Sequence, residues 1–501
     1  MAGHSDTPVA VSRTTRTSWR ARGSRTTRAR WAVRGSRRQS LLRRVRTTTT
    51  VLGMLLLVAC GGDGPDPATH PAWIPGIAVN PAHCTQALHA STGPETPAEF
   101  LPITFFQAGH GWWGSGTDAT FQLDDPTDTC LGTQSAWMRS GGTGQNTRIG
   151  HTGIGPYDFT DRDVVVWVKV DDWAHLDVLR LWLSSDEGDF TDAVTFDLTT
   201  LTDDALRYCR PGEWVRFVVP WGHGVPEPGT TVDRSAIRTV QLQVFDDNSG
   251  HPVRVHWNGL AAVSRSGNPF PHGVVSLTFD DGYATQSTEA ARYLDTRGMR
   301  GTLYVLRSYV DAGGSHLDES QLRSLQDDSG WEIAAHADKA TVHDRARGYA
   351  SSEPAVVEAD LRAVQEWLLA RGFHGGAQFA YPKGYHDDGV LTVARRITAS
   401  GRILINTPLE TWRPSDPHRL RAYMLTGSTP VSAVTELVDL AVADRAWLIL
   451  VFHQLESPAP VHGTTPADFR TIVDHIAASG AEVLPVGEVL ARGRGESTSG
   501  S

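Results

Sequence analysis

Two regions of the chain differ in how their hydrophobic residues are spaced. Between about residues 95 and 265, short apolar runs alternate with polar residues in steps of two, and turn-rich clusters separate the runs. This period is typical of β-strands. Examples of the runs expected to form strands are 163–170, 178–183, 213–219, 239–245 and 253–257. Because no segment between them has convincing helical spacing, we predict an all-β sandwich with a jelly-roll-like arrangement.

From about residue 272 the spacing changes to strands that alternate with helices. Strands are expected at 274–279, 302–306, 331–335, 378–381, 402–406, 447–452 and 482–486. Helices are expected at 285–297, 319–328, 355–370, 390–400, 431–443 and 465–479. This alternation indicates βα units with a parallel sheet. Roughly seven such units predict an α/β domain built as a deformed (β/α)7 barrel.

The first 59 residues differ from the rest of the chain. They carry thirteen Arg, no Lys and one acidic residue, and they end in a nine-residue apolar run, 51–59. A membrane-spanning helix needs about 20 apolar residues, so this run has the length of a signal-peptide core. Cys60 and a Gly-rich segment follow, an order that resembles a bacterial lipoprotein signal. We expect lipidation of Cys60 and anchoring on the outer face of the cell membrane; an ordinary secretory signal is the alternative.

These changes in composition divide the chain into five expected parts. They are a leader (1–59), a tether (60–75), a β-sandwich (76–268), the α/β domain (269–492) and a disordered tail (493–501). The sandwich is a candidate carbohydrate-binding module, because ten of the sixteen Trp lie between Trp73 and Trp257. Exposed aromatic rings stack on sugars, and Trp112–Trp113 in a Gly-rich loop is the candidate platform. Clusters of oxygen ligands at 124–125 and 246–248 are either calcium sites or solvated turns.

Net charge and cysteine count narrow the partners and the compartment. The formal net charge is −10, but residues 60–501 alone carry 33 basic and 55 acidic residues, a net charge of −22. An acidic body argues against nucleic acids and polyanionic substrates. After Cys60 there remain Cys84, Cys130 and Cys209, whose spacing matches no zinc motif. One disulfide and one free thiol are expected in an exported protein, with the pairing left open.

Several predicted strands of the α/β domain end in polar side chains. The end residues are Asp280 and Asp281 after 274–279, His336 after 331–335 with His343 a short loop later, Tyr381 and Pro382 at 378–381, and His453 after 447–452. In α/β barrels the carboxyl ends of the strands carry the active site. Two His and a carboxylate there make a candidate divalent metal site with positions for water. A solvated Asp-Gly turn and structural histidines are the alternative interpretation.

Together these segments resemble the polysaccharide deacetylases (NodB homology, carbohydrate esterase family four). The blocks that carry the resemblance are 278–282 (TFDDG), the His336/His343 pair, 379–382 (FAYP) and 450–453 (LVFH). The resemblance covers about residues 272–492, less than half of the chain. It implies a divalent metal, usually zinc, held by Asp281, His336 and His343.

The resemblance also implies a reaction, removal of N-acetyl groups from a polysaccharide of the N-acetylglucosamine type. The metal polarises the carbonyl and lowers the pKa of a bound water, and Asp280 acts as general base. The backbone N–H of Tyr381 assists the oxyanion, and His453 protonates the leaving amine. The alternatives are an O-acetyl (xylan-type) esterase on the same fold and a non-catalytic glycan-binding lipoprotein.

The chain departs from the family pattern in three places. Ala337 replaces a Ser or Thr and the second His comes seven positions after the first, so Asp338 is a rival third ligand. Ala380 stands where an Arg usually orients the base. The Asp-Trp motif that supports the acid is not evident. Trp412 and Asp416 are its nearest candidates, as a substrate-stacking ring and an orienting carboxylate, and an ordinary loop is the alternative.

Overall fold

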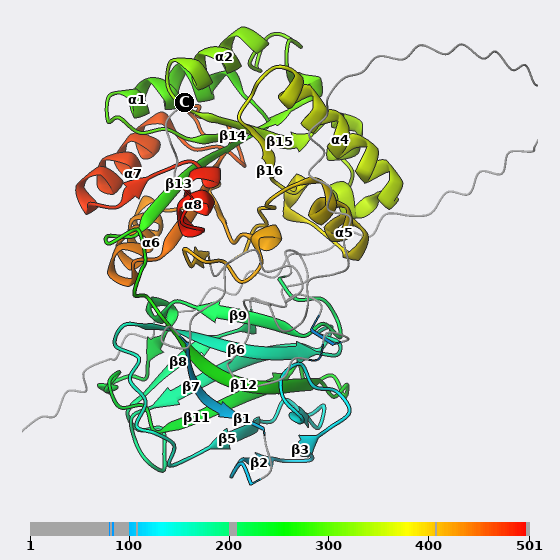
Figure 1. Cartoon of the computed structure of the whole chain (residues 1–501), viewed down its shortest axis with the longest axis vertical. Coiled ribbons are helices and arrows are strands. Elements are labelled where there is room, and N and C mark those ends of the chain that lie inside the picture. The colour runs from blue at the N-terminus through cyan, green and yellow to red at the C-terminus, as the bar shows by residue number, and fades with distance from the viewer. Residues whose placement is uncertain are drawn as a thin grey trace, which may run out of the picture. The chain divides into compact units, whose positions relative to one another are not determined.

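The computed structural model of the chain describes residues 80, 83–84, 100–106, 109–199, 208–405 and 408–496 (Figure 1). The predicted leader, the tether, Cys60 and most of the predicted tail lie outside these residues. Within the described ranges, every helix is too short or too polar to cross a membrane.

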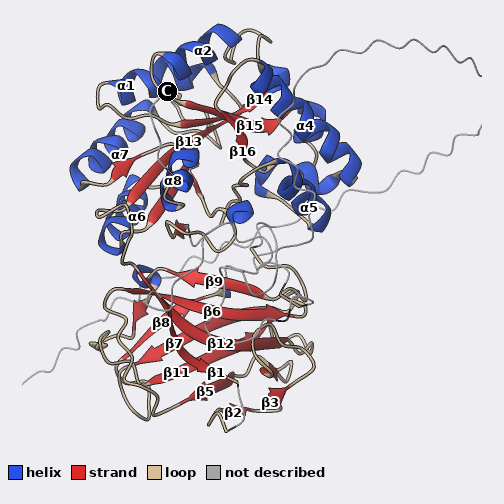
Figure 2. Cartoon of the chain, viewed as in Figure 1, coloured by secondary structure: helices blue, strands red, loops and turns tan. Residues whose placement is uncertain are grey.

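The described residues between 100 and 264, called here the sheet region, form two antiparallel sheets of six strands each (Figures 1 and 2). One sheet has the order β3-β4-β12-β6-β9, with β1 also paired to β12, and the other has the order β10-β8-β7-β11-β5-β2. The strands are β1 Phe100–Phe105, β2 Trp113–Gly116, β3 Thr120–Asp125, β4 Ser135–Arg139, β5 Thr147–His151, β6 Arg162–Val170, β7 Leu176–Ser184, β8 Ala193–Asp197, β9 Val215–Val219, β10 Val225–Pro226, β11 Thr239–Asp246 and β12 Arg254–Ser264.

Strand β6 shows how the apolar alternation becomes a two-sheet core. Val164, Val166 and Val168 lie in the large apolar cluster, which also contains side chains of the facing sheet. Val165 and Trp167 lie in a second cluster on the other side. Successive residues of a strand point to opposite faces, so an unbroken apolar run is buried on both. The all-β prediction for this region is confirmed, and the jelly-roll topology stays a prediction.

The structure decides the cysteine pairing that the sequence left open. Cys84 and Cys130 form a disulfide. Both sulfurs belong to the cluster that covers the outer face of β6. Cys209 is buried and unpaired, and burial raises the pKa of its thiol. A thiol of this kind is inert because the thiolate is the reactive form.

The structure bears on two expectations for the sheet region, the aromatic platform at Trp112–Trp113 and the choice between calcium sites and turns. Trp112 is only 6% exposed and stacks on Phe106 with ring centroids 4.4 Å apart, so its ring is not a free sugar platform. The carboxylate of Asp246 accepts hydrogen bonds from the backbone N–H groups of Gly142 and Gly144, at 2.9 and 2.6 Å. It therefore braces a turn. Among the described residues of this region, no three ligating side chains lie close enough to hold an ion.

Residues 272–492, called here the βα region, form an eight-stranded sheet flanked by helices (Figure 2). Its order is β16-β15-β14-β13-β19-β17, with β18 paired to β19 and β20 paired to β13. All pairs are parallel except β17 with β19. The strands are β13 Val274–Asp280, β14 Thr302–Leu306, β15 Glu332–Ala337, β16 Gly375–Phe379, β17 Leu409–Glu410, β18 Tyr423–Met424, β19 Trp447–Phe452 and β20 Glu482–Val483. The helices are α1 Arg292–Asp295 (preceded by a π-helical turn, Gln286–Ala291), α2 Glu319–Asp327, α3 Ala340–His343, α4 Pro354–Ala370, α5 Asp388–Ile397, α6 Val431–Asp444, α7 Pro466–Ser479 and α8 Val486–Gly493.

The two faces of β13 carry different side chains. Val275, Leu277 and Phe279 belong to the large apolar cluster, together with residues of the helices. Ser276 and Thr278 alternate with them and donate hydrogen bonds to the carbonyl oxygens of Leu484 and Leu450, at 2.7 and 2.9 Å. Strand periodicity places Asp280 on this second, inner face of the sheet. The same rule places His336 of β15 and His453 after β19 on inner faces.

The strand predicted at 402–406 is not among the strands of the described structure, which is a correction. Arg402 is joined to its neighbours only by single bridges, one to Ala380 and one to Leu420. Ile403 and Ile405 donate backbone hydrogen bonds to Leu420 and Ala422, so the described part of this segment follows its neighbour without forming a named strand. The parallel sheet with alternating helices is confirmed. A closed sevenfold barrel stays a prediction, because bridges rather than ladders connect β16 to β18 through residues 402 and 420.

Candidate active site

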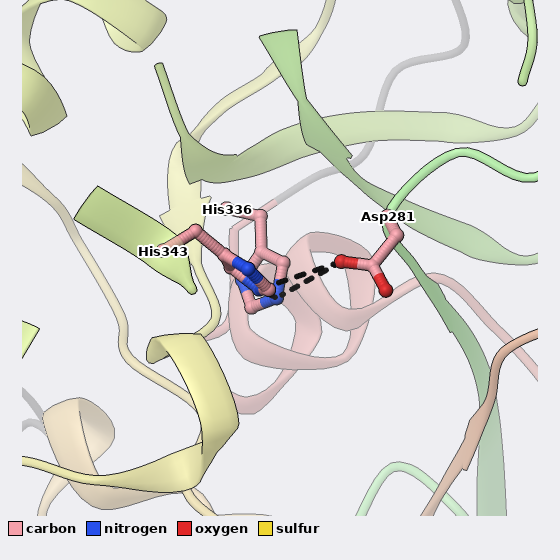
Figure 3. Close-up of side chains that lie close together, drawn as sticks. All are labelled: Asp281, His336 and His343. Atoms are coloured by element: carbon pink, nitrogen blue, oxygen red, sulfur yellow. Dashed lines mark hydrogen bonds and ion pairs between the residues drawn. The ribbon is translucent and has the colours of Figure 1, made fainter. Parts of the chain in front are cut away.

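Three side chains converge at the carboxyl ends of β13 and β15 (Figure 3). Oδ1 of Asp281 lies 3.7 Å from Nε2 of His336 and 3.4 Å from Nε2 of His343. The two Nε2 atoms are 3.2 Å apart. All three residues are buried, and the described chain holds no other group of three ligating side chains. The three predicted ligands are therefore brought together around one point.

The local backbone explains how adjacent residues reach different places. Asp280 ends β13 with its side chain on the inner face, whereas Asp281 has a positive φ of 71° and Gly282 follows with a φ of 80°. Asp tolerates this left-handed conformation better than most side chains, and Gly adopts it freely. The turn swings the second carboxylate towards the two imidazoles.

The hydrogen bonds of the two histidines suit a bound cation. Nδ1 of His336 lies 2.7 Å from the carbonyl oxygen of Ala380, so it is the nitrogen that donates a proton. Nδ1 of His343 lies 2.8 Å from Oδ1 of Asp344. Each Nε2 then presents a lone pair to the other, which is unfavourable without a cation between them. Oδ1 of Asp281 is buried and has no hydrogen-bond partner among the described residues.

Burial also keeps one ligand neutral. It lowers the pKa of His336 to about 4, so the imidazole is uncharged near neutral pH. A neutral imidazole is the form that binds metals. Two imidazoles and one carboxylate that leave coordination positions open make a donor set that fits Zn²⁺ or a similar divalent ion.

The rival ligand Asp338 is directed elsewhere. Its Oδ1 accepts a hydrogen bond from Nη1 of Arg307 at 2.5 Å. The structure thus favours His343 as the third ligand. His343 is within reach because the short helix α3 turns the chain back, which spacing along the sequence does not show.

Asp280 lies beside the ligand cluster as a second, chemically distinct carboxylate. It is 4% exposed, and Nη2 of Arg402 donates to its Oδ2 at 2.6 Å. Nε2 of His453 lies 3.9 Å from the same oxygen. Burial by itself raises the pKa of Asp280, but Arg402, His336 and His453 outweigh it and hold the pKa below its ordinary value. Oδ1 has no hydrogen-bond partner in the described structure, so it is available to accept a proton.

Arg402 contacts the candidate site and was not singled out from the sequence. It is 1% exposed, its guanidinium lies over the ring of Tyr304 at 5.2 Å, and it neighbours Ala380 through a single bridge. The arginine that is missing at position 380 is therefore supplied in space from position 402. One signal was available: an Arg at the start of an otherwise apolar predicted strand needs a buried partner.

His453 lies close to Asp280 because β13 and β19 are paired parallel strands with Phe279 opposite Phe452, and one side chain also joins the two strand ends. Nε2 of Gln286 donates to the carbonyl oxygens of Asp280 at 2.6 Å and of His453 at 3.3 Å. Nδ1 of His453 is buried and has no hydrogen-bond partner within the described ranges. The carboxylate expected to orient this imidazole is thus not among its described contacts.

Asp416, predicted to be that carboxylate, has other partners, which is a correction. Its side chain has no exposed surface, and Oδ2 lies 2.7 Å from Nη2 of Arg395 and 3.3 Å from Nε of Arg419. Oδ1 accepts from the backbone N–H of His418 at 2.9 Å. Although burial opposes it, the two arginines lower the pKa of Asp416 to about 2. Asp416 is a buried anion whose described contacts are Arg395, Arg419 and the backbone of His418.

The other three residues predicted to bind substrate are also buried. Trp412 is 7% exposed and lies in an apolar cluster, and Pro382 is buried in a turn. The hydroxyl of Tyr381 donates to the carbonyl oxygen of His418 at 2.9 Å, and its backbone N–H donates to that of Arg402 at 3.2 Å. The Tyr381 N–H expected to assist an oxyanion is therefore already used inside the fold. These side chains are therefore part of the packing around the site.

Comparisons with known proteins agree with this picture for part of the chain. Residues 267–400 match the family model described as polysaccharide deacetylase. Similar solved structures include a family 4 carbohydrate esterase from Streptomyces lividans in complex with acetate, with 17% identity, 42% of this chain and 91% of that chain covered, and a TM-score of 0.30. Another is the chitin deacetylase of the fungal pathogen Colletotrichum lindemuthianum, with 15% identity, 45% and 89% covered, and a TM-score of 0.31.

A third similar structure is a family 4 pseudoenzyme from Bacillus anthracis, with 14% identity, 44% of this chain and 66% of that chain covered, and a TM-score of 0.30. No curated protein matches the chain.

Proposed function

We propose that this chain is a metal-dependent hydrolase that removes N-acetyl groups from an extracellular or cell-wall polysaccharide, a proposal supported by the match of residues 267–400 to the polysaccharide deacetylase model. The observation that carries the proposal is the convergence of Asp281, His336 and His343 beside the buried pair Asp280 and His453. A cation site next to a free carboxylate oxygen is suited to hydrolysis with water as the nucleophile.

The proposed metal is zinc, held by Asp281, His336 and His343. When bound, it would supply Lewis acidity, which polarises an acetyl carbonyl and lowers the pKa of a water at the site. Ala380 and Asp344 orient the ligand imidazoles through their contacts to Nδ1. Such outer partners fix the tautomer of each ring and raise its basicity.

The chain's own residues supply the two proton transfers. Asp280 accepts the proton of the attacking water on its free Oδ1, while Arg402 keeps the carboxylate ionised. His453 donates a proton to the leaving nitrogen as the carbon–nitrogen bond breaks. The products are acetate and a glucosamine-type residue, whose ammonium is compatible with a net charge of −22 in residues 60–501.

The proposal is tested by measuring bound metal and released acetate together. The full chain is incubated with N-acetylglucosamine oligomers and, separately, with an O-acetylated xylan. We expect about one metal ion per chain and acetate from the N-acetylated substrate, and loss of both in Asp281→Ala. Acetate from the xylan alone would reassign the chain as an O-acetyl esterase. Equal acetate release by wild type and Asp281→Ala, with no metal bound to either, would overturn the proposed site. Wild type that binds the oligomers but releases no acetate would indicate a glycan-binding protein.

We further propose that the chain is exported and anchored by lipid on Cys60. The support is the order of basic segment, nine-residue apolar run, cysteine and Gly-rich segment in residues 1–64. In a bacterial host, wild type is expected in the membrane fraction and Cys60→Ser in the soluble exported fraction. Equal distribution of the two proteins would contradict anchoring through this residue.

A further inference from the structure

Buried charged side chains of the βα region reach groups of the sheet region. The described residues of both regions belong to one compact unit. Arg419 donates from Nη2 and Nη1 to the two carboxylate oxygens of Glu213, at 2.5 and 3.0 Å, and also to the carbonyl oxygen of Tyr208 at 2.7 Å. Arg421 donates to the carbonyl oxygen of Val218 in β9 at 3.1 Å. The side chains of Arg419 and Arg421 are 0% and 2% exposed.

Glu213 is the main acceptor for Arg419. It is 8% exposed and also binds Nε of Arg210 at 3.2 Å. Burial alone raises the pKa of Glu213, but Arg419 and Arg210 outweigh it and lower the pKa, so the carboxylate is ionised. The other anion near Arg419 is Asp416, 3.3 Å away. A buried ion pair holds its partners firmly, because removing one charge leaves the other unpaired inside the protein.

The segment that carries Arg419 supports the segment that carries Arg402. The backbone N–H of Leu420 donates to the carbonyl oxygen of Gly401 at 2.8 Å, and that of Ile403 donates to Leu420 at 2.9 Å. The backbone N–H of Arg402 donates to the carbonyl oxygen of Phe379 at 2.8 Å, so residue 402 lies outside any long ladder, held from the end of β16 on one side and, through its neighbours, from Leu420 on the other. A residue outside a ladder depends on the few neighbours that hold it, and here one neighbour is anchored on the sheet region.

We propose that the sheet region is a positioning element of the active site. Glu213 holds Arg419, Arg419 sets the place of residues 417–421, and these residues set Arg402 on Asp280. The proposal rests on the proposed function only in treating Asp280 as the general base. In this proposal the sheet region holds the 417–421 segment of the same chain. Glu213 is then a positioning residue that acts through Arg419.

The test compares two interface carboxylates in the full-length chain. Glu213→Ala removes the anchor of Arg419. The matched control is Asp161→Asn, because Asp161 also pairs across the two regions, with Arg445, but its pair is exposed and has no contact to residues 401–421. Amide hydrogen exchange of Ile403 and Leu420 is measured together with bound metal, KM and kcat.

In Glu213→Ala we expect the exchange of Ile403 and Leu420 to quicken by about tenfold or more. We expect kcat to fall by roughly 10- to 100-fold with KM and bound metal unchanged, since a small displacement of a supporting group slows the reaction without removing the metal. Asp161→Asn should match wild type within about twofold. Equal exchange in the two variants would overturn the proposal.

A second variant guards against loss of folding. Glu213→Gln keeps the size and hydrogen-bonding oxygen of the side chain and loses only its charge, so it takes the place of Glu213→Ala if that protein does not fold. If wild type releases no acetate, the proposed function fails. The exchange comparison then still decides whether Glu213 holds the 401–403 segment.

Discussion

The proposed metal-ligand side of the site and its proposed proton-transfer side are built in different ways. Asp281, His336 and His343 come from two short segments, and each stands where the family resemblance implies it. On the other side, Asp280 is held by Arg402, a residue outside every recognised motif. The expected support for His453 is likewise absent from its described contacts.

The difference follows from how tightly geometry constrains each group. Metal ligands must lie within a few ångströms of one atom, and strand ends with tight turns achieve this locally. A buried carboxylate, in contrast, needs only one cation close to one of its oxygens. Any neighbouring segment can supply it, so the position of that arginine along the chain is free to change.

The sharpest way to separate the two sides is Asp280→Asn. The amide cannot act as a general base, so kcat should fall by roughly 100- to 10,000-fold. Bound metal should stay near one ion per chain, because Asp280 is not one of the three converging ligands. The measurement is acetate release together with metal analysis. Loss of bound metal in this variant would show that Asp280 also takes part in metal binding.

A smaller effect is expected for Arg402→Ala. The variant leaves Asp280 buried without its cation, which should cost about 3–5 kcal/mol in the free energy of unfolding and slow kcat by roughly 10- to 100-fold. Denaturant unfolding and acetate release measure these quantities.

The control restores the family's arrangement. In the double variant Arg402→Ala/Ala380→Arg, a guanidinium can return to the same place, because residues 380 and 402 are bridged neighbours. Recovery of about tenfold in kcat is expected. A double variant no better than the single one would show that Arg402 acts only in folding.

The buried network under the proton-transfer side gives a pH test. The pKa of Asp416 is lowered to about 2, so its contribution to stability is full above its unfolded pKa of about 4 and is lost as pH falls towards 2. The free energy of unfolding of wild type minus that of Asp416→Asn should therefore shrink by about 2 kcal/mol between pH 5 and pH 2. Denaturant titrations at several pH values check this. A difference that stays constant with pH would mean that Asp416 has an ordinary pKa.

The smallest effect is expected for Asp338→Asn. Asp338 pairs with Arg307, so metal affinity should stay within about twofold of wild type. His343→Ala should lower the affinity by more than about 100-fold, beyond what loss of an outer partner causes. Competition with a chelator measures both. The opposite ranking would make Asp338 the third ligand.

Much of the fold was predictable from periodicity alone. The strands at 163–170 and 447–452 appear as β6 Arg162–Val170 and β19 Trp447–Phe452, because apolar alternation and buried apolar runs are local properties of the chain. The two-residue strands β17 and β18 and the helix α8 were missed. Segments of two residues carry no period, and α8 follows directly after a predicted strand.

The sequence by itself singled out Asp280, Asp281, His336 and His453 as candidate site residues, because each stands at the end of a predicted strand whose direction follows from the pleat. Only the tertiary structure decided the choice of His343 over Asp338, the pairing of Cys84 with Cys130 and the role of Arg402. Each of these depends on segments that are distant or irregular along the chain and that packing brings together. The local sequence pattern does not predict contacts between such segments, so charge pairs and disulfide pairing are known only from the folded structure.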